Sequence, residues 1–218
     1  MEVDIILDAG HGGFDNGASY MGRAEKDDVL RLTLAVGAKL KEAGYNVYYT
    51  RTTDVYNSPN EKAQLANLSG GNYFISFHRN SGMEDNLYNG VQTLIYQHND
   101  TVDTLAENIN RQLENVGFKN LGVEEVPGLI VLRKTEMPAV LVEVGFLDNP
   151  EDNQRFLWKP VLSTATLITS FLTKNLMPSW MPLSQASKKV FHFPHNRFRN
   201  IITCRQDCSN MTSMPLTS

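Results

Sequence analysis

The stretch LDAGHGGFDNGA, residues 7–18, follows a short apolar run and sets the first expectation for the fold. Val3, Ile5 and Ile6 have β-branched side chains, which favour a strand over residues 2–7. The glycines that follow predict a turn-rich loop, with His11 just past the end of that strand. A histidine at this point is either a metal ligand or an ordinary turn residue, and the rest of the chain must decide between the two.

Strand and helix signals alternate through the first 150 residues. Apolar residues at helical spacing predict a helix over 29–43, with Asp27 or Asp28 as its N-cap. The sequence SPNE at 58–61 is a capping box, which starts a helix that ends near residue 68. We expect a further helix over 101–116 and strands over 47–50, 73–78, 91–96, 129–132 and 139–144. This alternation predicts an α/β fold, a single layered domain whose sheet is covered by helices.

Composition narrows the class of protein. The 218 residues are 41% apolar and carry a net charge of −4, without a long basic run in the first three quarters, so no nucleic-acid partner is expected. No stretch approaches the ~20 apolar residues that span a bilayer, so no membrane insertion is expected. The acidic start MEVD does not resemble a signal peptide. The only cysteines are Cys204 and Cys208, which leaves the main body without a disulfide framework.

The chain changes character after about residue 150. Gly145 is the last glycine, and residues 177–218 contain five Lys or Arg, one acidic residue and four prolines. We therefore expect one domain over 1–176, ending in a helix over 161–176, and a basic, glycine-free, poorly ordered tail over 177–218. The spacing of His192, His195, Cys204 and Cys208 in that tail is too loose to predict a second zinc site.

Four residues form the candidate site. His11, His78 and Glu143 stand where predicted strands end, and Glu25 lies in the loop after His11. Ligands of open α/β sheets bind at the carboxyl ends of strands, and two imidazoles, one carboxylate and a second carboxylate for protons suit a catalytic zinc. Each residue also has a plain structural interpretation. His11 would be a turn residue, His78 a partly buried strand residue, and Glu143 the partner in a buried salt bridge.

Five stretches carry a resemblance to a known family. They are LDAGHGGFDNGA, EKD at 25–27, TRTTD at 50–54, FISFHRN at 74–80 and MPAVLVEVGFLDNPED at 137–152. In order and spacing, from residue 3 to about 157, they resemble the zinc-dependent N-acetylmuramoyl-L-alanine amidases of bacterial cell walls. The resemblance implies a twisted mixed sheet flanked by helices, with His11, Glu25 and His78 as zinc ligands and Glu143 as the catalytic carboxylate.

The same resemblance implies one Zn²⁺ per chain and peptidoglycan as the substrate. The bond cleaved would be the amide between the lactyl group of N-acetylmuramic acid and the L-alanine that starts the stem peptide. We expect a monomer, made in the cytoplasm without a recognisable signal peptide, that acts at the cell wall after release or export. Only 65 positions separate His78 from Glu143, which predicts no inserted helical plug over the zinc.

Several alternatives remain at this point. A non-hydrolytic wall-binding relative or a zinc peptidase of different specificity would carry the same residues, whereas GHGG lacks the Lys-Ser/Thr of a nucleotide-binding P-loop. Arg51 and Asp54 are expected to make structural loop contacts. Asn80 either orients substrate or belongs to a turn, and His98 is expected to be solvated. Arg79 stands where many relatives have a small residue.

Overall fold

The computed structural model describes residues 3–156 and residue 166. The strands are β1 (Asp4–Ala9), β2 (Ser19–Tyr20), β3 (Arg23–Ala24), β4 (Asn46–Tyr49), β5 (Tyr73–Asn80), β6 (Val91–Ile95), β7 (Asn120–Glu125) and β8 (Ala139–Phe146). The helices are α1 (Glu25–Glu42), α2 (Pro59–Ser69), α3 (Asp100–Asn115), α4 (Ile130–Lys134) and α5 (Pro150–Gln154). The helix expected over 161–176 and the tail over 177–218 lie outside the described residues.

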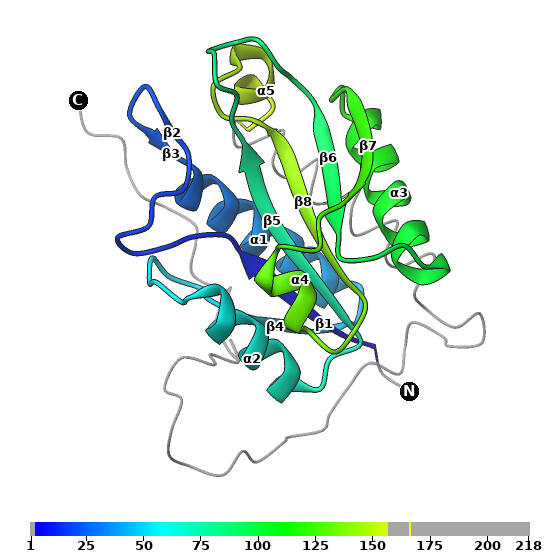
Figure 1. The fold of residues 1–218 in the computed structure, drawn as a ribbon. Coiled ribbons are helices and arrows are strands. Elements are labelled where there is room, and N and C mark those ends of the chain that lie inside the picture. The colour runs from blue at the N-terminus through cyan, green and yellow to red at the C-terminus, as the bar shows by residue number, and fades with distance from the viewer. Residues whose placement is uncertain (1–2, 157–165, 167–218) are drawn as a thin grey trace.

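A six-stranded mixed sheet forms the centre of the molecule, in the order β4-β1-β5-β8-β6-β7 (Figure 1). Strands β4, β1, β5 and β8 are parallel, so their carboxyl ends meet at one edge of the sheet. Strand β6 is antiparallel to β8, and β7 is parallel to β6. The predicted fold class, an α/β domain with a mixed sheet flanked by helices, is confirmed.

Helices cover both faces of this sheet. Alternate strand residues such as Ile5, Ile75 and Val142 pack in one apolar cluster with the buried sides of α1 and α3. The residues between them, including Phe74 and Leu141, form a second cluster with α2 and α4. The face that a strand residue points to therefore decides which helix pair it meets.

The structure corrects several sequence-based expectations. Residues 129–132, expected as a strand, belong mainly to α4, because Val131 and Leu132 bury one helical side against the α2 side of the sheet. Helix α1 begins at Glu25 with Ala24 as its N-cap, earlier than Asp27 or Asp28 would place it. The sequence analysis also missed α5, the β2-β3 hairpin and β7, an edge strand whose side chains are largely exposed.

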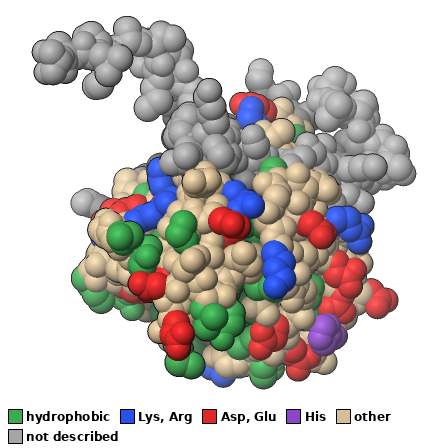
Figure 2. Space-filling model, turned by 90° about the horizontal axis from the view of Figure 1, so that it is seen from above, with side chains coloured by type: hydrophobic (Ala, Val, Ile, Leu, Met, Phe, Trp, Pro, Cys, Tyr) green, Lys and Arg blue, Asp and Glu red, His purple; other side chains and the backbone are tan. Residues whose placement is uncertain are grey.

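Charge is unevenly spread over the surface. On the face seen from above, acidic side chains gather beside a histidine at the lower right, while apolar side chains are scattered among charged ones (Figure 2). Acidic clusters of this kind repel polyanions. Within the described residues, no helix combines the length and apolar character that a membrane span requires.

Candidate metal centre

Strand register places His78 beside Glu143. The two residues are direct partners of the parallel β5-β8 pair, so their side chains leave the same face of the sheet. His78 lies four residues after Phe74 and Glu143 two residues after Leu141, so both point to the same face of the sheet as those residues. This is the face that α2 and α4 cover. We expected His78 and Glu143 to be at the ends of their strands. The strands in fact continue past them, to Asn80 and Phe146.

His11 lies in a tightly held loop after β1. Its own φ of 58° and those of Gly12 and Gly13 are positive, which turns the chain sharply at the strand end. The buried Arg51 guanidinium donates hydrogen bonds to the carbonyls of Ala9 and Gly10, which fixes the start of the loop. This contact is the structural role that the sequence predicts for Arg51.

A second set of contacts fixes the far side of the same loop. Asp54 accepts a hydrogen bond from the Gly13 backbone N–H at 2.7 Å. Lys26 donates to the Gly13 carbonyl at 2.7 Å and pairs with the Asp54 carboxylate at 2.8 Å. Asp54 therefore has the expected structural role, and the loop that carries His11 is held from both sides.

Glu25 is the first residue of α1 and is almost completely buried. The positive end of the helix dipole favours a carboxylate at this position. Its Oε2 accepts a hydrogen bond from the Ala18 backbone N–H, and its Oε1 accepts one from the Arg79 backbone N–H, both at 2.9 Å. The start of α1, the loop at Ala18 and strand β5 together therefore fix the orientation of the Glu25 carboxylate.

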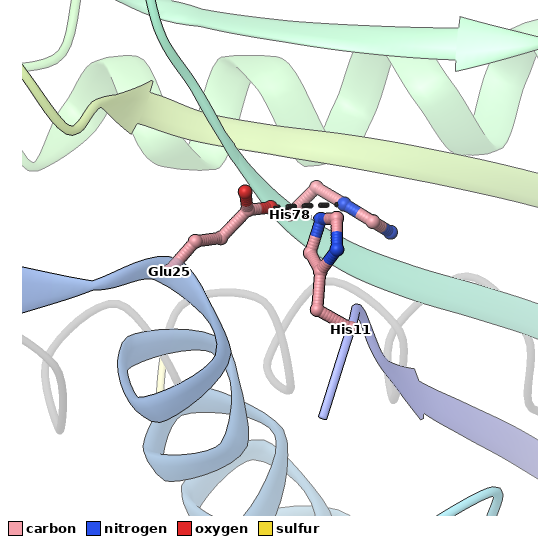
Figure 3. Close-up of side chains that lie close together, drawn as sticks. All are labelled: His11, Glu25 and His78. Atoms are coloured by element: carbon pink, nitrogen blue, oxygen red, sulfur yellow. Dashed lines mark hydrogen bonds and ion pairs between the residues drawn. The ribbon is translucent and has the colours of Figure 1, made fainter. Parts of the chain in front are cut away.

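The structure brings His11, Glu25 and His78 together (Figure 3). They come from the loop after β1, the first turn of α1 and strand β5, and one ligand atom of each lies within 4.8 Å of the others. Glu25 Oε1 is 3.2 Å from His11 Nε2 and 2.9 Å from His78 Nδ1. This spacing matches neighbouring ligands around one ion held at ~2.0–2.2 Å by nitrogen and oxygen atoms.

Two glycines make room for this cluster. A Cβ added at Gly10 would overlap the His78 ring, and one added at Gly17 would overlap both Glu25 Oε2 and the His11 ring. Gly17 also has a positive φ of 62°, which other residues rarely adopt. Backbone and ligands approach so closely here that any side chain would displace them.

Charge pairing dominates the electrostatics of the cluster. Burial alone would raise the pKa of Glu25, but hydrogen bonds and positive charge from His11 and His78 outweigh it and hold that pKa well below its usual value. Burial would lower the pKa of His11, yet the carboxylates of Glu25 and Asp15 raise it above its usual value. The carboxylate is therefore ionised at neutral pH, as a metal ligand must be.

Asp15 supports His11 from behind. Its Oδ2 is 2.9 Å from His11 Nδ1, and because an ionised carboxylate only accepts, Nδ1 must donate this bond. His11 Nε2 is then the ring atom that faces the cluster. A carboxylate behind a metal-binding histidine is a recurrent feature of metal sites. The sequence analysis missed Asp15, although a carboxylate four residues after a candidate ligand was a usable signal.

Glu143 is not one of the three clustered residues. Its Oε2 is buried and has no hydrogen-bond partner among the described residues, an unusual state for a carboxylate. Burial raises the pKa of Glu143 to about 7, the negative charge of Glu25 acts in the same direction, and the nearby His78 offsets part of the effect. A carboxyl group with this pKa can both accept and release a proton near neutral pH.

A pocket of about 280 Å³ opens beside the cluster. His11, His78 and Asp15 line it, together with the apolar residues Leu129 and Ile130. The remaining lining residues are Asp8, Asn57, Pro59, Lys62, Gly128, Val131 and Leu141. Substrate would thus meet the clustered residues from a largely apolar space.

Arg79 is a buried structural residue. Its side chain pairs with Asp28 at 2.6 Å, donates to the carbonyls of Val144 and Phe146, and lies over the Phe156 ring at 4.0 Å. Because Asp28 belongs to the first turn of α1, this pair ties the helix start that carries Glu25 to β5 and β8.

Two other residues follow plain structural interpretations. The Asn80 side chain accepts from the Ser81 backbone N–H, which is turn chemistry. His98 is exposed and pairs with Asp103 at 2.8 Å, well away from the cluster in the sequence and on another part of the fold. Neither contact brings a further group to the candidate centre.

Fold and site together define an α/β domain with a candidate metal centre at the carboxyl edge of its sheet. The N-acetylmuramoyl-L-alanine amidase family matches residues 5–171. The chain is 38% identical over 161 residues to N-acetylmuramoyl-L-alanine amidase CwlM of Bacillus licheniformis, a match that covers 70% of this chain and 60% of that protein. It is 34% identical over 176 residues to the sporulation-specific amidase of Bacillus subtilis, covering 77% and 63%.

Solved structures agree with this assignment. An N-acetylmuramoyl-L-alanine amidase from Clostridium difficile 630 superposes with a TM-score of 0.76 at 30% identity, covering 80% of this chain and 97% of that one. AmiC2 of Nostoc punctiforme gives a TM-score of 0.74, also at 30% identity, with the same coverage. The chain therefore belongs to the N-acetylmuramoyl-L-alanine amidase family. It matches 60 and 63% of the length of the two curated relatives.

Proposed function

We propose that this chain hydrolyses the amide between the lactyl group of N-acetylmuramic acid and L-alanine in peptidoglycan, and so acts at the bacterial cell wall. His11, Glu25 and His78 would hold one Zn²⁺, and Glu143 would be the catalytic carboxylate. The observation that carries the proposal is the convergence of these three side chains, from separate elements, beside a buried carboxylate with no partner among the described residues. Membership of the amidase family supports the choice of bond.

The donor set fits zinc. Two imidazole nitrogens and one carboxylate oxygen are typical of catalytic zinc sites, which keep a further position open. Asp15 fixes the ring of His11, and backbone N–H groups of Ala18 and Arg79 fix both oxygens of Glu25. A bound Zn²⁺ would polarise the scissile carbonyl and lower the pKa of water at the open position.

Glu143 would move the proton. Its Oε2, which has no hydrogen-bond partner among the described residues, would accept a proton from the attacking water and later release it to the departing amine of L-alanine. Burial raises the pKa of this carboxyl to about 7, and the positive charge of a bound Zn²⁺ would shift it toward the ionised form that accepts the proton. The strand pairing of Glu143 with His78 keeps this carboxylate next to the proposed metal ligands.

The apolar pocket would limit the water around the reacting amide. Leu129, Ile130 and Val131, from the α4 region, line it together with His11 and His78. Excluding water strengthens the electrostatic interactions of the reacting groups. The same walls would hold the neutral amide and its small neighbouring groups in place.

Product analysis tests which bond is cleaved. Purified peptidoglycan is incubated with the chain, with Zn²⁺ supplied, and new amino termini are labelled and identified. The proposal predicts new L-alanine amino termini and intact glycan strands, and the Glu143→Gln variant serves as the inactive control. New amino termini further along the stem peptide would identify a peptidase instead. Wall binding without any new termini would identify a non-hydrolytic relative.

A further inference from the structure

We propose that the side chains of Phe14 and Tyr56 form a subsite for a sugar ring of the glycan strand, an inference that rests on the proposed function. The two rings stack with centroids 4.2 Å apart and planes tilted by 34°. Phe14 is 81% exposed and Tyr56 39% exposed. A single exposed aromatic residue needs no explanation, but a stacked exposed pair beside a pocket does.

The loop presents Phe14 outward in a fixed position. Gly12 and Asp15 exchange two backbone hydrogen bonds, of 2.9 and 3.1 Å, so Phe14 lies at the tip of a closed turn. Asp54 and Lys26 hold Gly13 from outside the turn. A rigid, exposed aromatic ring can bind a ligand without an ordering cost.

Tyr56 is held in place by the same turn. Gly13 packs so closely against the backbone of Tyr56 that an added Cβ would lie 2.9 Å from its nitrogen. The two chain segments therefore form one surface, with Phe14 and Tyr56 side by side on it. We call this pair the aromatic platform.

The aromatic platform adjoins the candidate metal centre. The residues that follow its two members in the chain, Asp15 and Asn57, both line the pocket. Asp15 also contacts His11, so the turn that presents Phe14 follows directly after a proposed zinc ligand and ends at the group that orients it. A substrate placed at the centre would have one of its ends close to the aromatic platform.

Substrate chemistry makes a sugar the best occupant. The scissile amide is joined on one side to a peptide and on the other, through the short lactyl group, to a sugar ring. A pyranose has a flat face of C–H groups with polar groups at its rim, and the negative face of an aromatic ring attracts such C–H groups. Asp15, Asn57 and the Lys26–Asp54 pair supply polar partners around the aromatic platform.

Binding of peptide-free glycan strands tests the subsite directly. We expect Phe14→Ala to weaken binding, measured by calorimetry or NMR titration, by about 3- to 10-fold, the value of one aromatic contact. Phe14→Tyr should bind the glycan as well as the unmodified chain does because it keeps the aromatic ring. Phe14→Leu, which lacks the ring, should bind as weakly as Phe14→Ala. Leu68→Ala is the matched control, since Leu68 is also exposed, at 61%, and lies at the other end of α2.

Two substrates separate a sugar contact from a peptide contact. The kcat/KM for N-acetylmuramoyl-L-alanine is compared with that for lactoyl-L-alanine, which lacks the sugar. Phe14→Ala should lower the ratio of these values by about 3- to 10-fold, mainly through KM, and Leu68→Ala should leave the ratio unchanged. An equal loss on both substrates would assign the platform to the peptide and overturn the proposal.

The remaining outcomes are also decisive. Glycan binding by Phe14→Ala equal to that of the unmodified chain would overturn the subsite while leaving the amidase proposal intact. Glycan binding that depends on Phe14, in a chain that releases no L-alanine termini, would support the subsite and refute the amidase activity. A dimer that dissociates on Phe14→Ala, without a change in glycan binding, would make the platform a self-association surface and overturn the proposal.

Discussion

Glu25 joins the candidate centre to the fold at the scale of single residues. Its carboxylate contacts His11 and His78 and accepts backbone hydrogen bonds from a loop and from β5. The sequence indicates Glu25 only weakly, because a glutamate in a polar stretch is ordinary. Its position at the start of α1 becomes evident only once the helix is seen to begin there. The residue pattern named Glu25 as one of two candidate carboxylates, and only the resemblance to the amidase family implied that it, rather than Glu143, is the ligand.

The Oε2 of Glu143, which lacks a hydrogen-bond partner in the part of the chain that the structure describes, leads to the first prediction. Glu143→Gln keeps the size of the side chain but cannot accept a proton, so turnover should fall by about 10²- to 10⁴-fold. Zinc content, measured by elemental analysis, should stay near that of the unmodified chain because Glu143 is not a proposed ligand. Activity within a few-fold of the original would remove Glu143 from its catalytic role, and loss of zinc would make it a ligand.

The close approach of Gly10 to His78 gives a second prediction. Gly10→Ala places a methyl group against the His78 ring, which must shift from the position in which its Nδ1 lies 2.9 Å from Glu25 Oε1. We expect zinc affinity, measured by competition with a chelating dye, to fall by at least about tenfold. Gly128→Ala is the control, since an added Cβ there meets nothing within 4 Å. Unchanged affinity in Gly10→Ala would show that the ring is not held against the loop.

At the scale of elements, a buried ion pair joins β1, β5 and the residue after β4 to α2. Asp8 on β1 pairs with Lys62 of α2 at 3.0 Å and accepts hydrogen bonds from Thr50 and Ser76. Burial alone would raise the pKa of Asp8, but Lys62, Ser76 and Thr50 more than offset it and hold the pKa below its usual value. The ionised form of Asp8 therefore stabilises the fold above pH ~4, and this contribution is lost as pH falls.

Substitution of Asp8 tests this contribution. Asp8→Asn leaves the Lys62 charge buried without its partner, which should lower the free energy of unfolding at pH 7 by about 3–5 kcal/mol. Urea unfolding should show this difference shrinking as pH falls below about 4, because Asp8 becomes protonated first in the unfolded chain and, at still lower pH, in the folded chain. Glu84→Gln, at an exposed position, is the charge-matched control. A difference that does not change with pH would contradict the account.

Elements with strong local signals were predicted well. The capping box of Ser58 and Glu61 sets the start of α2, and the nearly continuous apolar runs of β5 and β8 match strands that are buried on both faces. The prediction of a strand over residues 129–132 was wrong because a four-residue apolar run suits a strand or a short helix equally. Strand β7 was not predicted because it is an exposed edge strand that contains Gly122, and its sequence shows no alternation of apolar and polar residues.

At the scale of the whole molecule, the site depends on contacts between distant segments. The sequence places His11, His78 and Glu143 near strand ends, and the parallel order of β1, β5 and β8 brings them to one edge of the sheet. Sequence patterns could not supply the support around them. The ion pair of Arg79 with Asp28 depends on how α1 packs against β5. The contact of Asp15 with His11 and the aromatic platform depend on loops whose paths only the structure gives.

A metal shared by three elements should stabilise the entire fold. Zn²⁺ at 100 to 1,000 times its dissociation constant adds about 2.7–4.1 kcal/mol of stability. In a chain of this size, the Tm of chelator-treated protein should therefore rise by roughly 5–15 °C when Zn²⁺ is restored. His78→Ala should show no such rise, because it lacks one proposed ligand. An equal rise in His78→Ala would place the zinc elsewhere.

The central claim, a zinc amidase, is tested most directly by following metal and product on one purified sample. Zinc content and newly formed L-alanine amino termini on peptidoglycan are measured before chelation, after chelation and after Zn²⁺ is returned. The account predicts about one zinc per chain, with L-alanine termini that disappear on chelation and return with the metal. L-alanine release that persists without zinc, or bound zinc that yields no L-alanine termini, would contradict it.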